Sequence, residues 1–157
     1  MKHILSFLAF IFICFNCLAQ QPAAGSIAPE IKLPNTKGSS VSLSSLKGKI
    51  VVIDFWASWC GPCRRSMPDL KAIYKKYKDK GLEVYAISVD TEKKDWNQAI
   101  KEDETSWVHV IDDNGAIARK WNVQYIPNTF LLDKQGKIVS VNANHVALEQ
   151  QIAALLN

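Results

Sequence analysis

The sequence predicts one α/β domain with a central mixed β-sheet flanked by helices. Two runs of nearly continuous apolar and β-branched residues, 49–55 and 82–89, are typical of strands buried on both faces. Between them, apolar residues from Met67 to Tyr77 recur at intervals of three and four, as on one face of a helix. The C-terminal part adds two strands joined by a tight turn and then a helix, which places helices on both faces of the sheet.

Shorter patterns predict the remaining elements. Between Ile31 and Leu43, apolar alternation interrupted by proline, asparagine and glycine predicts an N-terminal β-hairpin. Gly81 is expected to end the long helix. Farther along the chain, we expect a helix over 92–101, strands over 108–111, 129–132 and 137–141, a short helix over 116–121, and a last helix from about His145 capped by Asn144.

Residues 1–19 differ from the rest of the chain and read as a signal peptide. A short positive start is followed by an almost wholly apolar run over 4–15 and by small residues ending at Ala19. The apolar run is shorter than the roughly 20 residues that span a membrane. We therefore expect export, most simply to the periplasm. An uncleaved anchor facing the periplasm and lipidation of Cys17 stay open as alternatives. Residues 20–26 read as a linker, and 27–157 as the folded domain.

Charge gives little indication of a macromolecular partner. The 157 residues carry a formal charge of +4, and the charges are scattered. The densest run, 71–80, holds five lysines separated by tyrosines and an aspartate. Such a run is typical of the solvated face of a helix rather than of a nucleic-acid-binding surface. We expect a monomer that binds no nucleic acid.

Cysteine spacing points to a redox pair. Cleavage after Ala19 would remove Cys14 and Cys17 and leave only Cys60 and Cys63. A disulfide between these two closes a very small loop, which stabilises a fold weakly because little loop-closure entropy is removed. The spacing therefore favours a bond that opens and closes over a structural disulfide.

Other uses of two cysteines find less support in the sequence. A zinc site would need two more ligands, and His109 and His145 are single and far apart, so we interpret them as surface or satisfied residues. Haem attachment would need a histidine where Arg64 stands. We expect neither a metal nor a cofactor.

The position of the pair matters more than its spacing. Pro62 suits the first turn of a helix, so Cys60 is placed at the N-terminus of the long helix. Unpaired N–H groups and the helix dipole there stabilise a thiolate, and the cysteine pKa in such motifs falls to about 7 or below. Cys60 would attack a substrate disulfide, and Cys63, about one turn along, would resolve the mixed disulfide.

The segment 54–63, with the sequence DFWASWCGPC, closely resembles the active-site segment of thioredoxins. The stretch 26–68 more specifically resembles the exported TlpA/ResA group, with Ala28-Pro29-Glu30 near its start and the Ser-Leu-x-x-Leu-x-Gly-Lys stretch over 42–49. The resemblance implies a thioredoxin-like fold with an N-terminal β-hairpin and a helix–strand insertion, placed within about 90–111. Pro68 resembles the proline that kinks the long helix in this family.

The resemblance also implies roles for residues around the pair. Asp54 matches a buried acid that accepts a proton from the second cysteine, here Cys63; a solvated acid at a strand end is the alternative. Pro127 matches a cis-proline opposite the pair, and an ordinary turn proline is the alternative. The backbone of Ile126 would pair with an extended substrate chain.

Further residues are implied to contact substrate or to surround the site. Trp59, Gly61 and Pro62 join Ile126 as expected substrate contacts, and Trp56 packs around the site or belongs to the core. Some relatives carry an acid near the cysteines in the second half of the chain, where Ile126 is apolar. Glu83 could match another family acid.

Three functions follow as hypotheses. The first is a disulfide reductase of exported proteins, kept reduced by a membrane electron donor, because a Gly-Pro dipeptide between the cysteines favours the reducing end of the scale. The second is a thiol peroxidase, which would want a Thr and an Arg around the attacking cysteine, where 56–59 reads WASW. The third is a binding or chaperone module whose cysteines are incidental.

Overall fold

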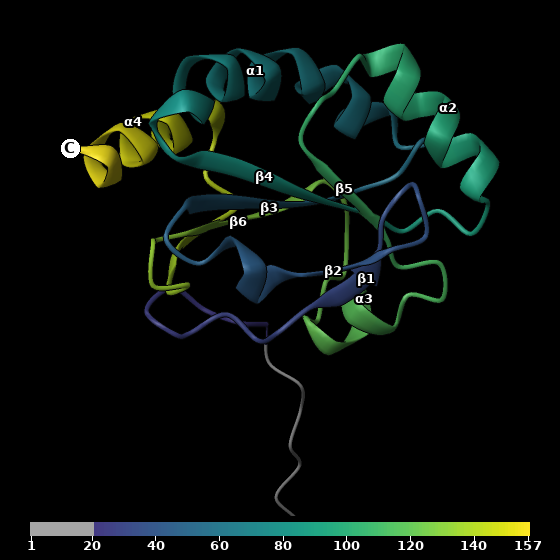
Figure 1. Ribbon diagram of the computed structural model, residues 1–157, viewed down its shortest axis with the longest axis horizontal. Coiled ribbons are helices and arrows are strands. Elements are labelled where there is room, and N and C mark those ends of the chain that lie inside the picture. The colour runs from purple at the N-terminus through teal and green to yellow at the C-terminus, as the bar shows by residue number, and fades with distance from the viewer. Residues whose placement is uncertain (1–20) are drawn as a thin grey trace, which may run out of the picture.

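The computed structural model describes residues 21–157 and has at its centre a five-stranded mixed sheet (Figure 1). The strand order is β5-β4-β3-β6-β7. Strands β3, β4 and β5 are parallel, and β6 and β7 are antiparallel additions. Their bounds are β3 Ile50–Trp56, β4 Leu82–Ser88, β5 Val108–Ile111, β6 Asn128–Leu132 and β7 Ile138–Val141. The predicted mixed sheet is confirmed.

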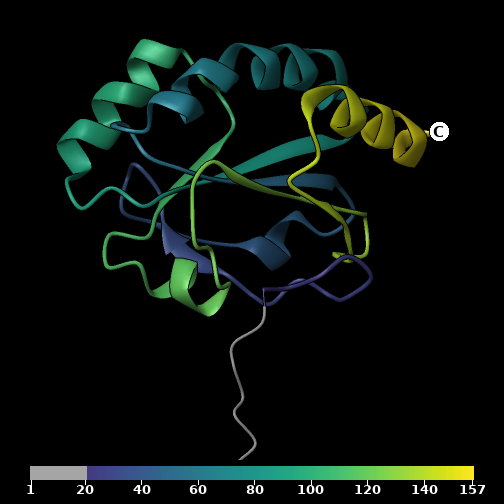
Figure 2. The ribbon, with the colours of Figure 1, turned by 180° about the vertical axis from the view of Figure 1, so that it is seen from behind.

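Helices cover both faces of the sheet, but unequally. The long helices lie together along one face, at the top of Figure 1, and Figure 2 shows the same layer from behind. These are α1 Gly61–Tyr77, α2 Lys93–Asp103 and α4 His145–Leu156, with the 3-10 turn η2 Lys78–Lys80 after α1. The other face carries the hairpin β1 Lys32–Pro34 and β2 Ser40–Ser42, the 3-10 turn η1 Leu43–Leu46 and α3 Ala116–Lys120.

Strand β3 divides the interior into two cores, because successive side chains of a strand point to opposite faces. Val51, Ile53 and Phe55 pack against the hairpin and α3. Ile50, Val52 and Trp56 pack against α1, α2 and α4. Asp54 lies on the same face of β3 as this second set, because side chains alternate along a strand. Its carboxyl therefore points toward the long helices.

Local signals place the helix ends where the sequence predicts them. Gly81 has a φ of 107°, the left-handed conformation that glycine adopts without steric cost, and it closes the turn after α1. The Asn144 side chain accepts a hydrogen bond from Ala147 N at 3.0 Å and caps α4. Pro68 lies inside α1, which continues to Tyr77; a kink at this proline stays a prediction.

The predicted N-terminal hairpin and helix–strand insertion are both present. Helix α2 and strand β5 occupy the window from 90 to 111. The lysines of 71–80 lie on the solvated side of α1 and η2, as the sequence predicts.

The chain segment before β1 contacts the sheet. Gly25 N donates to Ile138 O at 2.8 Å, and Ile138 N donates to Ser26 O at 2.9 Å, so this segment lies along β7. The predicted signal peptide, including Cys14 and Cys17, lies outside the described residues. Over 21–157, the helices lack the length and apolar character needed to cross a membrane.

Candidate active site

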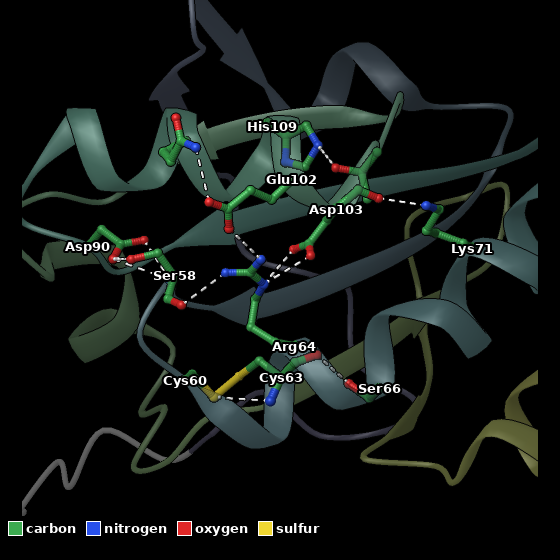
Figure 3. Close-up of polar contacts among 12 residues, drawn as sticks. Ser58, Cys60, Cys63, Arg64, Ser66, Lys71, Asp90, Glu102, Asp103 and His109 are labelled. Carbon is green, nitrogen blue, oxygen red and sulfur yellow. Dashed lines mark hydrogen bonds and ion pairs between the residues drawn. A yellow bond between two sulfur atoms is a disulfide. The ribbon is translucent and has the colours of Figure 1, made fainter.

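Cys60 and Cys63 form a disulfide at the start of α1 (Figure 3). The two sulfurs are 2.06 Å apart and the Cα atoms 5.3 Å apart. Cys60 is the N-cap of the helix, and its sulfur accepts a hydrogen bond from Cys63 N at 3.2 Å. Pro62 lies in the first turn, where a missing N–H costs no helical hydrogen bond. The helix therefore directs an N–H donor and its positive end at the Cys60 sulfur.

The surroundings of the disulfide are open on one side. Cys60 is 4% exposed and Cys63 2%, so both sulfurs are largely covered in this state. Trp59 is 69% exposed, and Gly61 and Pro62 are exposed. The exposed indole of Trp59 and the exposed first residues of α1 thus flank Cys60 in the sequence.

Asp54 lies beneath the long helices in the interior. Its side chain is 6% exposed, and within residues 21–157 its carboxylate accepts no hydrogen bond. Burial raises the pKa of Asp54 from 3.8 to about 7, and the charge of His145 opposes that rise. A carboxyl with such a pKa can take up or give off a proton near neutral pH.

A cavity of about 330 Å³ opens beside Asp54. Its lining includes Pro127, Thr129 and Asn142 from the β6–β7 side and His145 from α4. A water molecule occupies about 30 Å³ in the liquid, so the cavity has room for several waters. His145 Nδ1 lies 2.7 Å from Asp69 Oδ2, and both residues reach solvent. Asp54 and Pro127 thus line the same cavity, which the two cysteines do not line.

The segment 125–127 precedes β6. The Ile126–Pro127 peptide bond is cis. Tyr125 is 62% exposed, whereas Ile126 is half-buried and packs against both cores. The Gln21 side chain donates to Asn128 Oδ1 at 3.2 Å, so the start of the described chain also reaches this segment.

The two tryptophans near the cysteines differ. Trp56 is fully buried, and its ring meets His109 at a centroid distance of 6.2 Å, so it belongs to the core, whereas Trp59 is exposed.

His109 is itself buried at 7% exposure, and Thr105 Oγ1 lies 2.8 Å from its Nε2. Burial lowers the pKa of His109 to about 4, so the ring is neutral at physiological pH. His109 is therefore not a surface residue, and it is satisfied at Nε2 only, because its Nδ1 is buried and has no hydrogen-bond partner within residues 21–157.

No metal site emerges around these groups. Within residues 21–157, no three His, Cys, Asp or Glu side chains gather closely enough to hold a metal ion. His145 pairs with Asp69 rather than with a second histidine.

Ser58, two residues before Cys60, is held at both of its backbone groups (Figure 3). Its N–H donates to the two carboxylate oxygens of Asp90 at 3.0 and 3.2 Å, and its hydroxyl donates to Asp90 Oδ1 at 2.6 Å. Its carbonyl accepts a hydrogen bond from Arg64 Nη1 at 3.3 Å. The sequence motif around the cysteines did not predict this cluster of Ser58, Arg64 and Asp90. Strand order could have done so, since Asp90 follows β4 and the carboxyl ends of the parallel strands β3 and β4 meet at one edge.

Comparison with known proteins agrees with this geometry. Residues 24–141 match the AhpC/TSA family. The thiol-disulfide oxidoreductase ResA of Bacillus thuringiensis subsp. konkukian is 34% identical over 115 residues, and that of Bacillus subtilis is 35% identical over 117 residues. The matches cover 73% and 74% of this chain, and the chain spans 66% and 65% of the length of these relatives.

Solved structures resemble the whole described domain. The thioredoxin domain of a thiol-disulfide oxidoreductase from Bacteroides vulgatus has a TM-score of 0.80 and 36% identity, with coverage of 86% of this chain and 99% of that one. A thiol-disulfide oxidoreductase from Bacteroides fragilis has a TM-score of 0.77 and 33% identity, with coverage of 83% and 99%. The chain therefore belongs to the AhpC/TSA family and has the thioredoxin-like fold of these thiol–disulfide oxidoreductases.

Proposed function

We propose that the protein is a thiol–disulfide oxidoreductase that reduces protein disulfides through Cys60 and Cys63. The observation that carries this proposal is the pair itself, joined at 2.06 Å at the N-terminus of α1 with the Cys63 N–H directed at Cys60 Sγ. A helix N-terminus stabilises the thiolate that performs the exchange. Named relatives with the same activity support the assignment.

The exchange has two balanced steps. The Cys60 thiolate attacks one sulfur of a substrate disulfide; a bond forms between them, the substrate S–S bond breaks, and the second substrate sulfur leaves as a thiolate. Cys63, once deprotonated, attacks Cys60 Sγ, which closes the intramolecular disulfide and releases the first substrate sulfur. The substrate gains two electrons, the cysteine pair loses two, and the released thiolates take protons from water.

Asp54 serves in this scheme as the proton acceptor for Cys63. Its burial, its pKa near 7 and the adjacent cavity support that role, because a base with such a pKa accepts a proton at neutral pH and can pass it to water. Since no hydrogen bond competes for its oxygens within residues 21–157, the carboxylate is free to accept.

Substrate contact falls to the exposed surface around the disulfide. Trp59 supplies an exposed apolar face, and Gly61 and Pro62 leave the start of α1 uncovered. Pro127 has no N–H to offer, so the neighbouring Ile126 backbone is the group that pairs with an extended substrate chain. These features suit a stretch of polypeptide rather than a small molecule.

The direction of exchange depends on an electron donor. No side chain of the Gly61-Pro62 dipeptide donates a hydrogen bond to stabilise the thiolate further, which favours a reducing potential. We propose a membrane partner as the donor, a monomeric protein, and export to the periplasm on the pattern of residues 1–19. Mass spectrometry of the protein from a periplasmic fraction would test export, and a mature chain that starts at Gln20 is the expected result.

Insulin reduction tests the activity. Cys60→Ser should abolish turnover, because no attacking thiolate remains. Cys63→Ser should accumulate mixed disulfides with substrates, which mass spectrometry can identify. Ala72→Ser places the same hydroxyl on an exposed position of α1 and should leave turnover unchanged. Turnover that survives Cys60→Ser would contradict the assignment.

A thiol peroxidase is the second candidate, because the AhpC/TSA match includes the N-terminal hairpin. The Cys60 thiolate would attack one oxygen of hydrogen peroxide, so that the O–O bond breaks, the other oxygen leaves as hydroxide and Cys60 becomes a sulfenic acid. The Cys63 thiol would then attack Cys60 Sγ, form the disulfide and release the sulfenic oxygen as water. The arginine nearest in sequence, Arg64, is engaged by Glu102 and Asp103 instead. Stopped-flow mixing of the reduced protein with hydrogen peroxide discriminates the two, since fast and saturable oxidation of Cys60 would favour the peroxidase.

A further inference from the structure

We infer that Asp90 and Arg64 are positioning residues for Cys60. Together they hold both backbone groups of Ser58 and so tie the loop before the redox pair to β4 and to the inserted helix α2. The inference rests on the proposed exchange function of Cys60 and extends it to residues far from the disulfide in sequence.

Asp90 forms the first half of this clamp. Its side chain is 2% exposed, and its hydrogen-bond partners among residues 21–157 are neutral donors: the Ser58 N–H, the Ser58 hydroxyl at 2.6 Å and the Ser88 hydroxyl at 2.6 Å. Ser88 Oγ also accepts the N–H of Asp90 at 2.9 Å. A buried carboxylate that loses such donors is destabilised, so the arrangement favours one loop conformation.

Arg64 forms the second half. Its guanidinium donates to Ser58 O at 3.3 Å, and its Nη2 lies 3.0 Å from Glu102 Oε2. Its Nε lies 2.8 Å from Asp103 Oδ2. Figure 3 shows these contacts converging from α2 on the first turn of α1. The planar guanidinium offers its donors in fixed directions, which lysine would not reproduce.

The clamp acts on the geometry of the attacking sulfur. Cys60 N donates to Ala57 O at 3.1 Å, and Cys60 Sγ accepts from Cys63 N, so Ser58 lies inside the turn that aims the sulfur at the helix. If Ser58 is released, the thiolate loses a fixed position relative to the N–H groups of α1. Its pKa should then rise toward that of an ordinary thiol, and attack should slow.

The test measures alkylation of Cys60 in the reduced protein as a function of pH, with mass spectrometry of the Cys60 peptide. Exchange with the small disulfide 5,5′-dithiobis(2-nitrobenzoic acid) is followed in parallel. Asp90→Ala should raise the pH midpoint of alkylation and slow both reactions about tenfold at pH 6. Arg64→Ala should slow them about threefold, because water can replace one donor at a partly exposed carbonyl.

Two further variants separate positioning from other effects. Asp90→Asn should remain within about twofold of wild type, since the amide oxygen can accept from Ser58 N and the Ser88 hydroxyl while the NH₂ donates to Ser58 Oγ. Arg65→Ala removes an exposed arginine that forms no ion pair within residues 21–157, and it should behave as wild type.

Three results would overturn the inference. One is a wild-type midpoint and rate in Asp90→Ala. Another is an Asp90→Asn variant as slow as Asp90→Ala, which would assign the effect to charge rather than to geometry. The third, which applies if Asp90→Ala does not fold, is an Arg64→Ala variant whose pH midpoint of Cys60 alkylation equals that of wild type. Failure of the proposed function is seen separately, as an absence of exchange in wild type while the alkylation midpoint remains measurable.

Discussion

Asp54→Asn is expected to make the oxidised protein more stable above pH 7. In wild type, burial raises the pKa of the Asp54 carboxyl from 3.8 to about 7. The folded chain therefore holds this proton more tightly than the unfolded chain does. Between these two pH values the folded state carries more protons, so the free energy of unfolding falls as the pH rises.

The magnitude follows from the size of the pKa shift. Each pKa unit corresponds to about 1.36 kcal/mol, so the interval from 3.8 to about 7 corresponds to about 4 kcal/mol. This stabilisation is fully present below pH 3.8 and is lost by pH 8, where Asp54 is ionised and accepts no hydrogen bond from residues 21–157. The Asn variant does not titrate, so it should match wild type near pH 4 and exceed it by about 4 kcal/mol at pH 8.

Urea unfolding of both proteins at half-unit steps from pH 4 to pH 8 measures the difference. Other groups titrate in this range, and His109 acts with the opposite sign because burial lowers its pKa to about 4. Subtracting one curve from the other cancels those contributions. Asp113→Asn is a matched control at an exposed aspartate, and its difference from wild type should stay flat across the same range.

Parallel stability curves for wild type and Asp54→Asn would refute the reasoning, since they would mean that Asp54 titrates at similar pH in the folded and unfolded chains. The same variant should also slow the resolving step at pH 7, because amide nitrogen and oxygen cannot accept the Cys63 proton. If the mixed disulfide of Asp54→Asn resolves at the wild-type rate, Asp54 is not the proton acceptor for Cys63. That outcome would not change the expected difference in stability, which depends only on the pKa of Asp54.

Three other substitutions test different parts of the structure. Trp121→Ala should cost about 3–5 kcal/mol in urea unfolding, because this fully buried ring packs against Phe55 and Phe130; a loss under 1 kcal/mol would contradict that packing. Trp59→Ala should leave the urea midpoint unchanged but slow reduction of insulin more than that of a small disulfide, and equal slowing would argue against a protein-binding surface. His109→Gln should remove the contribution by which His109 lowers the free energy of unfolding as the pH falls from 6.5 to about 4, so the free energy of unfolding of the variant should rise relative to wild type over that range; a constant difference between the two proteins would place the ring outside that titration.

Much of the fold could be predicted from the sequence because its signals are local. The apolar runs of β3 and β4, the periodicity of α1, Gly81 at its end and the Asn144 cap each depend on residues within a few positions of one another. The same holds for the redox pair, since a proline after Cys60 already marks the start of a helix. Asp54 could be assigned to the long-helix face only through resemblance and strand alternation.

The sequence by itself thus determined the order of the elements and the position of Cys60 and Cys63 at a helix N-terminus, because helix starts and side-chain periodicity are properties of short segments. Only the tertiary structure decided the surroundings of that pair. Ser58 meets Asp90 across 32 residues, and Arg64 meets Asp103 across 39. The burial that raises the pKa of Asp54 likewise requires α1 and α4 to close over β3, and no short segment of the chain encodes that contact alone.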